Sequence, residues 1–162
     1  MRNLVTCLLL VMLVPAGAPG QEKTKQKDGQ GYAFVGLGAI NAEAGTLQFG
    51  GGAEANLYKG LGIGLEIGYF SPMEAFGDGI GIFSVNGQYT FGLENPRRVK
   101  PFVTGGYSLA FRSDTANAMN FGGGIHYWLS NRLGLRLEIR DYIIPDIWDM
   151  HAWQGRVGLE FR

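Results

Sequence analysis

The sequence predicts an all-β protein, an eight-stranded antiparallel up-and-down transmembrane β-barrel. Three observations lead to this prediction. Eight segments alternate apolar and polar residues with a period of two, which is typical of strands with one apolar and one polar face. An apolar N-terminal run precedes these segments. The 27 glycines lie mostly inside the alternating segments rather than between them, so they need a structural reason.

Residues 1–20 are interpreted as a signal peptide for export. Arg2 gives the positive start, and the apolar run that ends at Val14 is shorter than the roughly 20 residues of a membrane-spanning helix. The only cysteine, Cys7, lies in this segment, so we expect a mature chain with no disulfide and no thiolate metal site. Residues 21–30 are polar, and we expect a flexible leader.

We expect the barrel to occupy residues 31–162. The connections around Lys59-Gly60 and Ser130–Arg132 are tight, Gly92–Lys100 at the same end is longer, and the other four lie at the opposite end. This layout of three and four connections is expected when an even number of strands starts and finishes on the same side. No segment shows a convincing helical period. The expected strands are Gly31–Ala39, Leu47–Tyr58, Leu61–Phe70, Ile80–Phe91, Phe102–Arg112, Met119–Leu129, Leu133–Tyr142 and Ala152–Arg162.

Composition indicates which strand face points outward. We expect no charge to interrupt the apolar faces within the strands, and a charge on the lipid side at mid-bilayer would cost about 2–4 kcal/mol. The polar faces mix glycine with long charged side chains, which suits the narrow interior of an eight-stranded barrel. A three-residue turn around Lys59 and Gly60 would place Glu54 opposite Glu66. We expect an interior polar network of Glu54, Glu66, Arg136, Glu138, Arg140, Arg156 and Glu160.

Aromatic residues on the apolar faces gather near the strand ends, and a mostly aliphatic band separates them. Two aromatic belts beside an aliphatic band are typical of a barrel that spans a membrane. We expect one girdle at the end with the longer loops, formed by Phe49, Tyr69, Phe83, Phe111, Phe121 and Trp153. We expect the other girdle to contain Tyr89, Phe91, Tyr127 and Phe161.

The run Asn120–Tyr142 (NFGGGIHYWLSNRLGLRLEIRDY), followed by Trp153–Arg162, resembles the small outer-membrane β-barrel family, the OmpA/OmpX-like group. The stretch Lys100–Phe111 resembles the fifth strand of that family. The resemblance implies export to the bacterial outer membrane of a Gram-negative cell and contact with its lipids. It also implies insertion by the barrel-assembly machinery, which reads an aromatic residue at the end of the last strand. Phe161 fits this signal, although Arg162 follows it.

The remaining candidate chemistry is weak. His126 and Ser130 lie four residues apart, which in a strand separates them by about 13 Å, whereas a nucleophile and its base need about 3 Å. Asp146, Asp149 and His151 share the last long loop, where a carboxylate–histidine pair could form a hydrolytic dyad or a weak cation site. The simpler interpretation is a solvated loop. We expect no enzyme activity, no cofactor and no metal.

The expected function is a structural or interaction role for a monomer with a plugged polar interior. A narrow passive channel for small solutes, an enzyme that modifies lipid A and a soluble exported ligand-binding barrel are the alternatives. The net charge of zero, with 17% charged residues, does not indicate a nucleic-acid partner. The sequence identifies no ligand.

Overall fold

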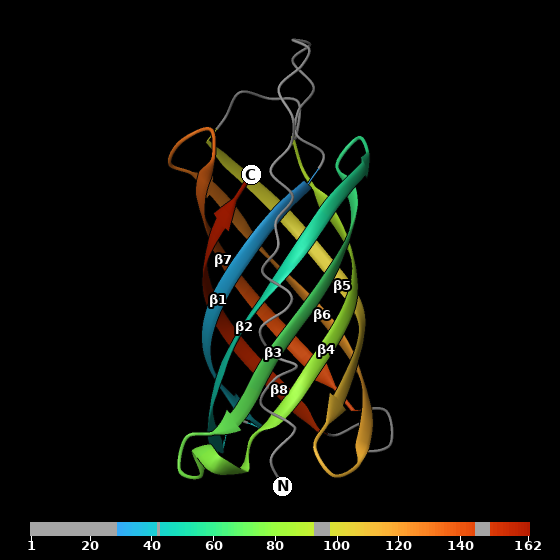
Figure 1. The fold of residues 1–162 in the computed structure, drawn as a ribbon, viewed down its shortest axis with the longest axis vertical. Helices are drawn as coiled ribbons and strands as arrows, with labels where there is room; N and C mark the ends of the chain where they lie inside the picture. Colours follow the sequence, from blue (N-terminus) through green and yellow to red (C-terminus); the bar gives the residue numbers. More distant parts are fainter. Residues whose placement is uncertain (1–28, 42, 93–97, 145–149) are drawn as a thin grey trace, which may run out of the picture.

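The protein is described here by a computed structural model, which describes residues 29–41, 43–92, 98–144 and 150–162. The expected signal peptide, residues 21–28 of the expected leader, Asp146 and Asp149 lie outside these residues. Eight antiparallel strands form a closed barrel in chain order (Figure 1). The strands are β1 (Gly29–Ile40), β2 (Ala44–Tyr58), β3 (Leu61–Pro72), β4 (Ile80–Thr90), β5 (Val99–Phe111), β6 (Thr115–Trp128), β7 (Leu133–Ile143) and β8 (His151–Phe161).

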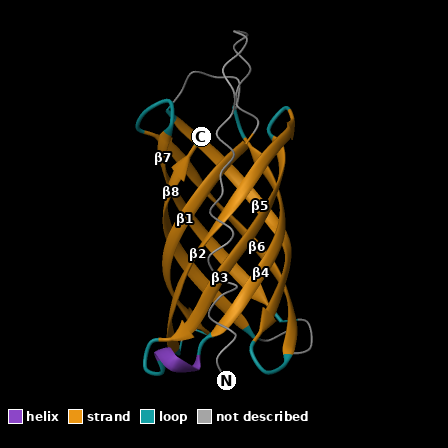
Figure 2. Ribbon diagram, in the orientation of Figure 1, coloured by secondary structure: helices purple, strands orange, loops and turns teal. Residues whose placement is uncertain are grey.

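The predicted fold class is confirmed, and each of the eight expected strands is present. One short 3₁₀ helix, η1 (Phe76–Asp78), follows β3 at the end of the barrel with the longer loops (Figure 2). The described residues include no helix long and apolar enough to cross a bilayer. The start of β1 and the end of β8 lie at the opposite end, where the tight turns are (Figure 1).

The barrel closes with a stagger along its strands. Following the paired residues once around the wall leads from Gly29 to Ala39 of the same strand, a shift of ten residues (39 − 29 = 10). Strand number and stagger together determine the tilt and the width of a barrel. With eight strands the interior is only wide enough for side chains.

The protein is apolar outside and polar inside. Ile139 is 62% exposed, whereas its neighbour Arg140 is completely buried. A similar alternation runs along β3, β7 and β8. Aliphatic side chains cover the wall, while amides, hydroxyls, charged groups and some apolar side chains are buried inside. The predicted orientation of the two strand faces is therefore confirmed.

The turn between β2 and β3 decides how the first interior carboxylates are placed. It consists of Lys59 and Gly60, both with positive φ (44° and 92°), as a type I′ hairpin turn requires. With the bulge just before it, this turn sets a register in which Glu54 faces Gly64. Glu66 also faces a glycine, so the conditional placement of Glu54 opposite Glu66 is wrong. A two-residue turn replaces the three-residue turn that it required.

Candidate functional site

Glycines make the room that the interior charged side chains occupy. Each of the seven expected network residues has a glycine as its paired neighbour on an adjacent strand. The pairs are Glu54–Gly64, Glu66–Gly52, Arg136–Gly158, Glu138–Gly124, Arg140–Gly122, Arg156–Gly36 and Glu160–Gly134. A methyl group on Gly36 would approach Cγ of Arg156 to 2.9 Å, and one on Gly124 would collide with the carbonyl oxygen of Leu137. Part of the high glycine content therefore serves the packing of the interior.

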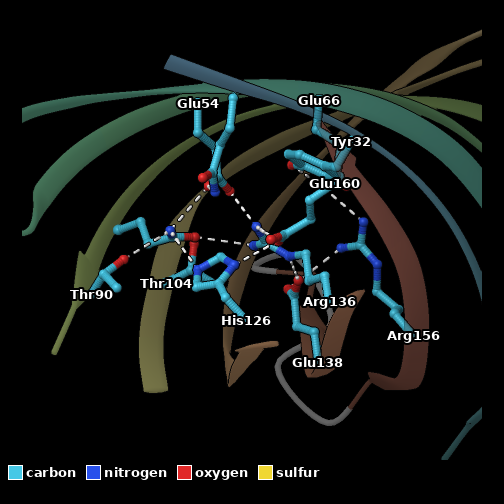
Figure 3. A network of polar contacts seen from close by, with 12 residues as sticks. Tyr32, Glu54, Glu66, Thr90, Thr104, His126, Arg136, Glu138, Arg156 and Glu160 are labelled. Atoms are coloured by element: carbon cyan, nitrogen blue, oxygen red, sulfur yellow. Dashed lines mark hydrogen bonds and ion pairs between the residues drawn. The ribbon is translucent and has the colours of Figure 1, made fainter. Parts of the chain in front are cut away.

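Arg136 on β7 is the centre of the polar contacts shown in Figure 3. It lies toward the end of the barrel where β1 starts and β8 ends. Its Nε donates to Glu138 at 2.7 Å, and its Nη1 donates to Glu54 on β2 at 2.5 Å. Its Nη2 donates to the amide oxygen of Gln88 on β4 at 3.0 Å. One guanidinium group thus joins three strands. Buried charge-assisted hydrogen bonds of this kind are among the stronger polar contacts in proteins.

Two aromatic rings also contact this guanidinium group. The Cζ atom of Arg136 lies 4.6 Å from the ring centre of Tyr32 on β1 and 4.3 Å from that of Phe102 on β5. A cation over the face of an aromatic ring is attracted by its quadrupole, and the attraction is stronger when the pair is desolvated. The rings therefore stabilise the charge and fill space beside it.

A second cluster of charged groups lies in the middle of the lumen. Arg140 donates from Nε to Glu138 at 2.6 Å and from Nη1 to Glu66 at 3.2 Å. Arg156 is 2.7 Å from Glu66 through Nη2, and its Cζ lies 3.5 Å from the ring centre of Phe34. The hydroxyl of Tyr32 donates to Glu66 at 2.8 Å. Glu138 connects this cluster to Arg136, so the two groups form one network.

Glu160 completes the network through a residue that the sequence analysis did not place there. Its Oε1 lies 2.5 Å from Nδ1 of His126 and 3.8 Å from Nη1 of Arg136. The other ring nitrogen of His126 is 3.3 Å from the amide nitrogen of Gln88. A proton on Nδ1 satisfies both contacts, because Nε2 can then accept from that amide. Because His126 lies on the polar face of its strand, its position in the sequence could have indicated that it joins the interior network.

His126 does not form a catalytic pair with Ser130. The hydroxyl of Ser130 accepts from the backbone amide of Leu133 at 3.1 Å, within its own turn. His126 points into the barrel and contacts Glu160 instead. Within the described ranges, no group of three or more His, Cys, Asp or Glu side chains is arranged to hold a metal ion.

Toward the loop end, the charged network gives way to neutral polar groups. Their hydrogen bonds, 2.6–2.9 Å long, join Ser84 with Ser108, Asn120 with Ser108, Gln154 with Thr46 and Gln48 with Tyr142. The amide oxygens of Gln48, Asn120 and Gln154 have no hydrogen-bond partner among the described residues. We call this region the neutral layer.

Apolar side chains close the lumen beyond the neutral layer. This group, the apolar cap, consists of Phe70, Ile82, Tyr142 and Ala152, with Ile40, Ile80 and Ala110 packed against it. At the opposite end Arg162 lies over Trp128, with its Cζ 3.6 Å from the ring centre. The sequence analysis did not predict these interior aromatic residues. Their positions on the polar faces of the strands could have revealed them, since alternate residues of a strand share a face.

The ten expected girdle residues lie on the outer wall, and Phe121 is near the middle of β6 rather than at its end. Most are between 37% and 54% exposed, and Tyr69 is half-buried. Neighbouring rings contact one another: Phe49 and Tyr69 have ring centres 5.5 Å apart, and Tyr89 and Phe91 are 5.0 Å apart. Phe91 directly follows β4. Contact of these rings with lipid headgroups stays a prediction.

One charged residue does interrupt the outward face. Asp141 on β7 pairs in register with Phe121 and Trp153, so it shares their side of the wall. It is only 7% exposed, because His151 covers it and contacts its carboxylate at 2.7 Å. The expectation that no charge interrupts the apolar faces is therefore wrong. His151 itself begins β8 instead of lying in the loop, and its carboxylate partner is on β7.

Comparison with known proteins finds a matching family model and similar solved structures. A family model described as "Outer membrane protein beta-barrel domain" matches residues 5–161. The N-terminal β-barrel domain of OprF from Pseudomonas aeruginosa is similar, with a TM-score of 0.64 and 16% identity, over 83% of this chain and 97% of that chain. Neisserial surface protein A (NspA) has a TM-score of 0.62 and 14% identity, over 82% of this chain and 94% of that chain.

A de novo designed transmembrane β-barrel is also similar. Its TM-score is 0.56 with 20% identity, over 84% of this chain and 97% of that chain. At such low identities these similarities show the fold alone. No curated protein matches the sequence.

Proposed function

The chain belongs to the outer membrane protein β-barrel domain family, and from this premise we propose that it is a closed, monomeric barrel of the bacterial outer membrane with a structural or interaction role. The filled lumen is the observation that carries the proposal. The charged network and the apolar cap occupy successive levels of one narrow interior. A solute would have to displace both.

The charged network resists such displacement because each of its arginines has several partners. Moving Arg136 would break its contacts with Glu54, Glu138 and Gln88 together. Separating one partner from a buried ion pair typically costs about 3–5 kcal/mol. These contacts support a plug that stays shut in the resting protein.

The outer surface supports contact with lipid as the principal interaction. Aliphatic residues such as Leu37, Leu65 and Ile139 are more than half exposed on the wall. A monomeric soluble protein seldom leaves so large an apolar area in water. The outward aromatic residues support the same proposal, because aromatic side chains are enriched where the headgroups of a bilayer meet such a barrel.

A narrow passive channel is the second candidate function. The unpartnered amide oxygens of Gln48, Asn120 and Gln154 favour it, because buried carbonyl oxygens of this kind commonly bind water. A hydrated neutral layer would shorten the part of the lumen that has to open. The charged network would still have to rearrange before solutes could pass.

Conductance of the purified protein in a planar lipid bilayer separates the two candidates. We expect no steady conductance from the wild-type protein, and steady single-channel steps would favour the channel. Electrophoresis with and without boiling provides the companion test. A compact band that shifts on heating supports a closed barrel, whereas a monomer that stays soluble without detergent would contradict membrane placement.

An enzymatic role in lipid A modification predicts a different observation. Overexpression would change the mass of lipid A, which mass spectrometry of the extracted lipid would detect. We expect no change, because the two histidines of the described residues are engaged by Glu160 and Asp141 without a neighbouring nucleophile in contact.

A further inference from the structure

The connection between β3 and β4 carries two large apolar side chains that are open to the surroundings. Met73 is 54% exposed and Phe76 is 52% exposed. Phe76 packs against two outward aromatic residues of the wall, with ring centres 6.3 Å from Phe49 and 5.6 Å from Tyr69. We call Phe49, Tyr69, Met73 and Phe76 the aromatic patch. It extends the outward apolar surface of β2 and β3 past the end of β3.

Met73 belongs to the same outward side. Its amide donates to the carbonyl of Gly45 at 3.0 Å. A methyl group on Gly45 would lie 3.1 Å from the sulfur of Met73, so this side chain covers a glycine of the wall. Gly45 is two residues from Leu47 and four from Phe49, and alternate residues of a strand share a face. Met73 thus lies against the wall and not over the mouth of the lumen.

Hydrogen bonds hold the connection in this position. The hydroxyl of Tyr69 donates to the carbonyl of Phe76 at 2.7 Å and accepts from the amide of Gly79 at 3.1 Å. Ser71 donates to the same carbonyl at 3.0 Å. From the connection after β5, Arg112 donates to the carbonyl of Asp78 at 2.8 Å. These hydrogen bonds therefore hold the turn in a conformation that leaves the ring of Phe76 exposed.

On the opposite side of the barrel, around β7, the outer surface near the aromatic residues is more polar. By strand order, β7 lies four strands away from β3 in the closed barrel. There Asp141 and His151 place polar groups between Phe121 and Trp153. On the β3 side, Met73 and Phe76 thus continue the apolar surface past the end of the strand, beside the exposed ion pair of Arg112 with Asp78. On the β7 side, Asp141 and His151 place polar groups within the girdle.

We propose that the Met73–Gly79 connection inserts into the headgroup–acyl boundary of the surrounding leaflet. The occupant of the aromatic patch is membrane lipid, because the patch is continuous with the lipid-facing wall. Aromatic side chains are favoured at this boundary. The inference rests on the proposed placement of the barrel in a membrane.

Nitroxide spin labels on single cysteines test this inference. The protein carries Cys7→Ser and is reconstituted into vesicles of phosphatidylcholine and phosphatidylglycerol. Power saturation compares the collision rate of each label with oxygen, which concentrates in lipid, and with a water-soluble nickel chelate. The label positions are Phe76→Cys and Met73→Cys in the patch, Asp114→Cys in the neighbouring connection after β5 and Leu65→Cys in the middle of the same wall.

We expect the ratio of oxygen to nickel collisions at positions 73 and 76 to be at least threefold higher than at position 114 and closer to that at position 65. The label at position 73 leaves Phe76 in place, so the test does not depend on removing that ring. If positions 73 and 76 match position 114 while position 65 is in lipid, the inference is wrong, and the patch is free for a protein partner. If position 65 also collides mainly with nickel, the proposed membrane placement fails.

Discussion

The two halves of the lumen are filled in different ways. Near the start of β1 and the end of β8, Arg136 has Glu54, Glu138 and Gln88 as hydrogen-bond partners and lies between two aromatic rings. Near the loops, the neutral layer contains hydrogen bonds between uncharged groups, such as that between Ser84 and Ser108. One half therefore depends on buried charges that share partners, and the other depends on hydrogen bonds between neutral groups.

This difference determines how each half responds to a substitution. Removing one member of a buried ion pair leaves its partner charged and desolvated, which costs about 3–5 kcal/mol. Removing a neutral hydrogen bond typically costs about 1 kcal/mol. The charged half should be sensitive to single changes, and the neutral half should be tolerant.

The largest expected effect is that of Arg136→Ala. It leaves the carboxylates of Glu54 and Glu138 without their principal shared cation and should reduce the free energy of unfolding by about 3–5 kcal/mol. Urea unfolding of the barrel in detergent micelles, followed by tryptophan fluorescence, measures this loss. Asp114→Ala in an exposed loop is the control and should stay within about 0.5 kcal/mol of wild type. Equal stabilities of the two variants would contradict a network that depends on Arg136.

The next largest effect concerns the space beside Glu138. Gly124→Ala places a methyl group against the carbonyl of Leu137 and should destabilise the barrel by about 1–3 kcal/mol, as overpacking usually does. The matched control is Gly87→Ala, where the nearest heavy atom would be the carbonyl oxygen of Gly105 at an ordinary 3.8 Å. The same urea titration compares them. A Gly124→Ala variant as stable as the control would show that the interior has spare room.

A smaller effect is expected in the neutral layer. Ser108→Ala removes the partner of both Ser84 and Asn120 and should cost about 1 kcal/mol. The double variant Ser84→Ala with Ser108→Ala should cost less than the sum of the single changes, because the two hydroxyls share one contact. Unfolding free energies of the three variants measure this coupling. A loss above about 3 kcal/mol for Ser108→Ala would remove the distinction between the two halves.

The smallest effect on stability is expected outside the lumen, for Arg112→Ala. Its ion pair with Asp78 is exposed on both sides, 49% and 69%, so its loss should cost no more than about 1 kcal/mol. The same change should release the connection between β3 and β4. A nitroxide at position 76 should then give narrower spectral lines than in the parent protein. Unchanged lines would show that Tyr69 and Ser71 hold the turn without Arg112.

The sequence predicted the wall of the barrel more accurately than its ends. Strand periodicity placed all eight strands, but β6 begins at Thr115 rather than Met119. Residues 115–118 carry no large apolar side chain, and they form a strand because they pair with the end of β5 in a hairpin. Asp141 was missed for a related reason. Its charge is covered by His151, which follows it by ten residues and lies beside it only after β7 and β8 have paired.

The sequence by itself determined which residues line the lumen and which face outward, because the alternation of side chains along a strand is a local property of the backbone. It also determined that long charged side chains stand among glycines. Only the tertiary structure decided which partners meet, as Arg136 and Glu54 are 82 residues apart. Their contact depends on the ten-residue stagger with which the barrel closes (39 − 29 = 10), and no local pattern specifies that stagger.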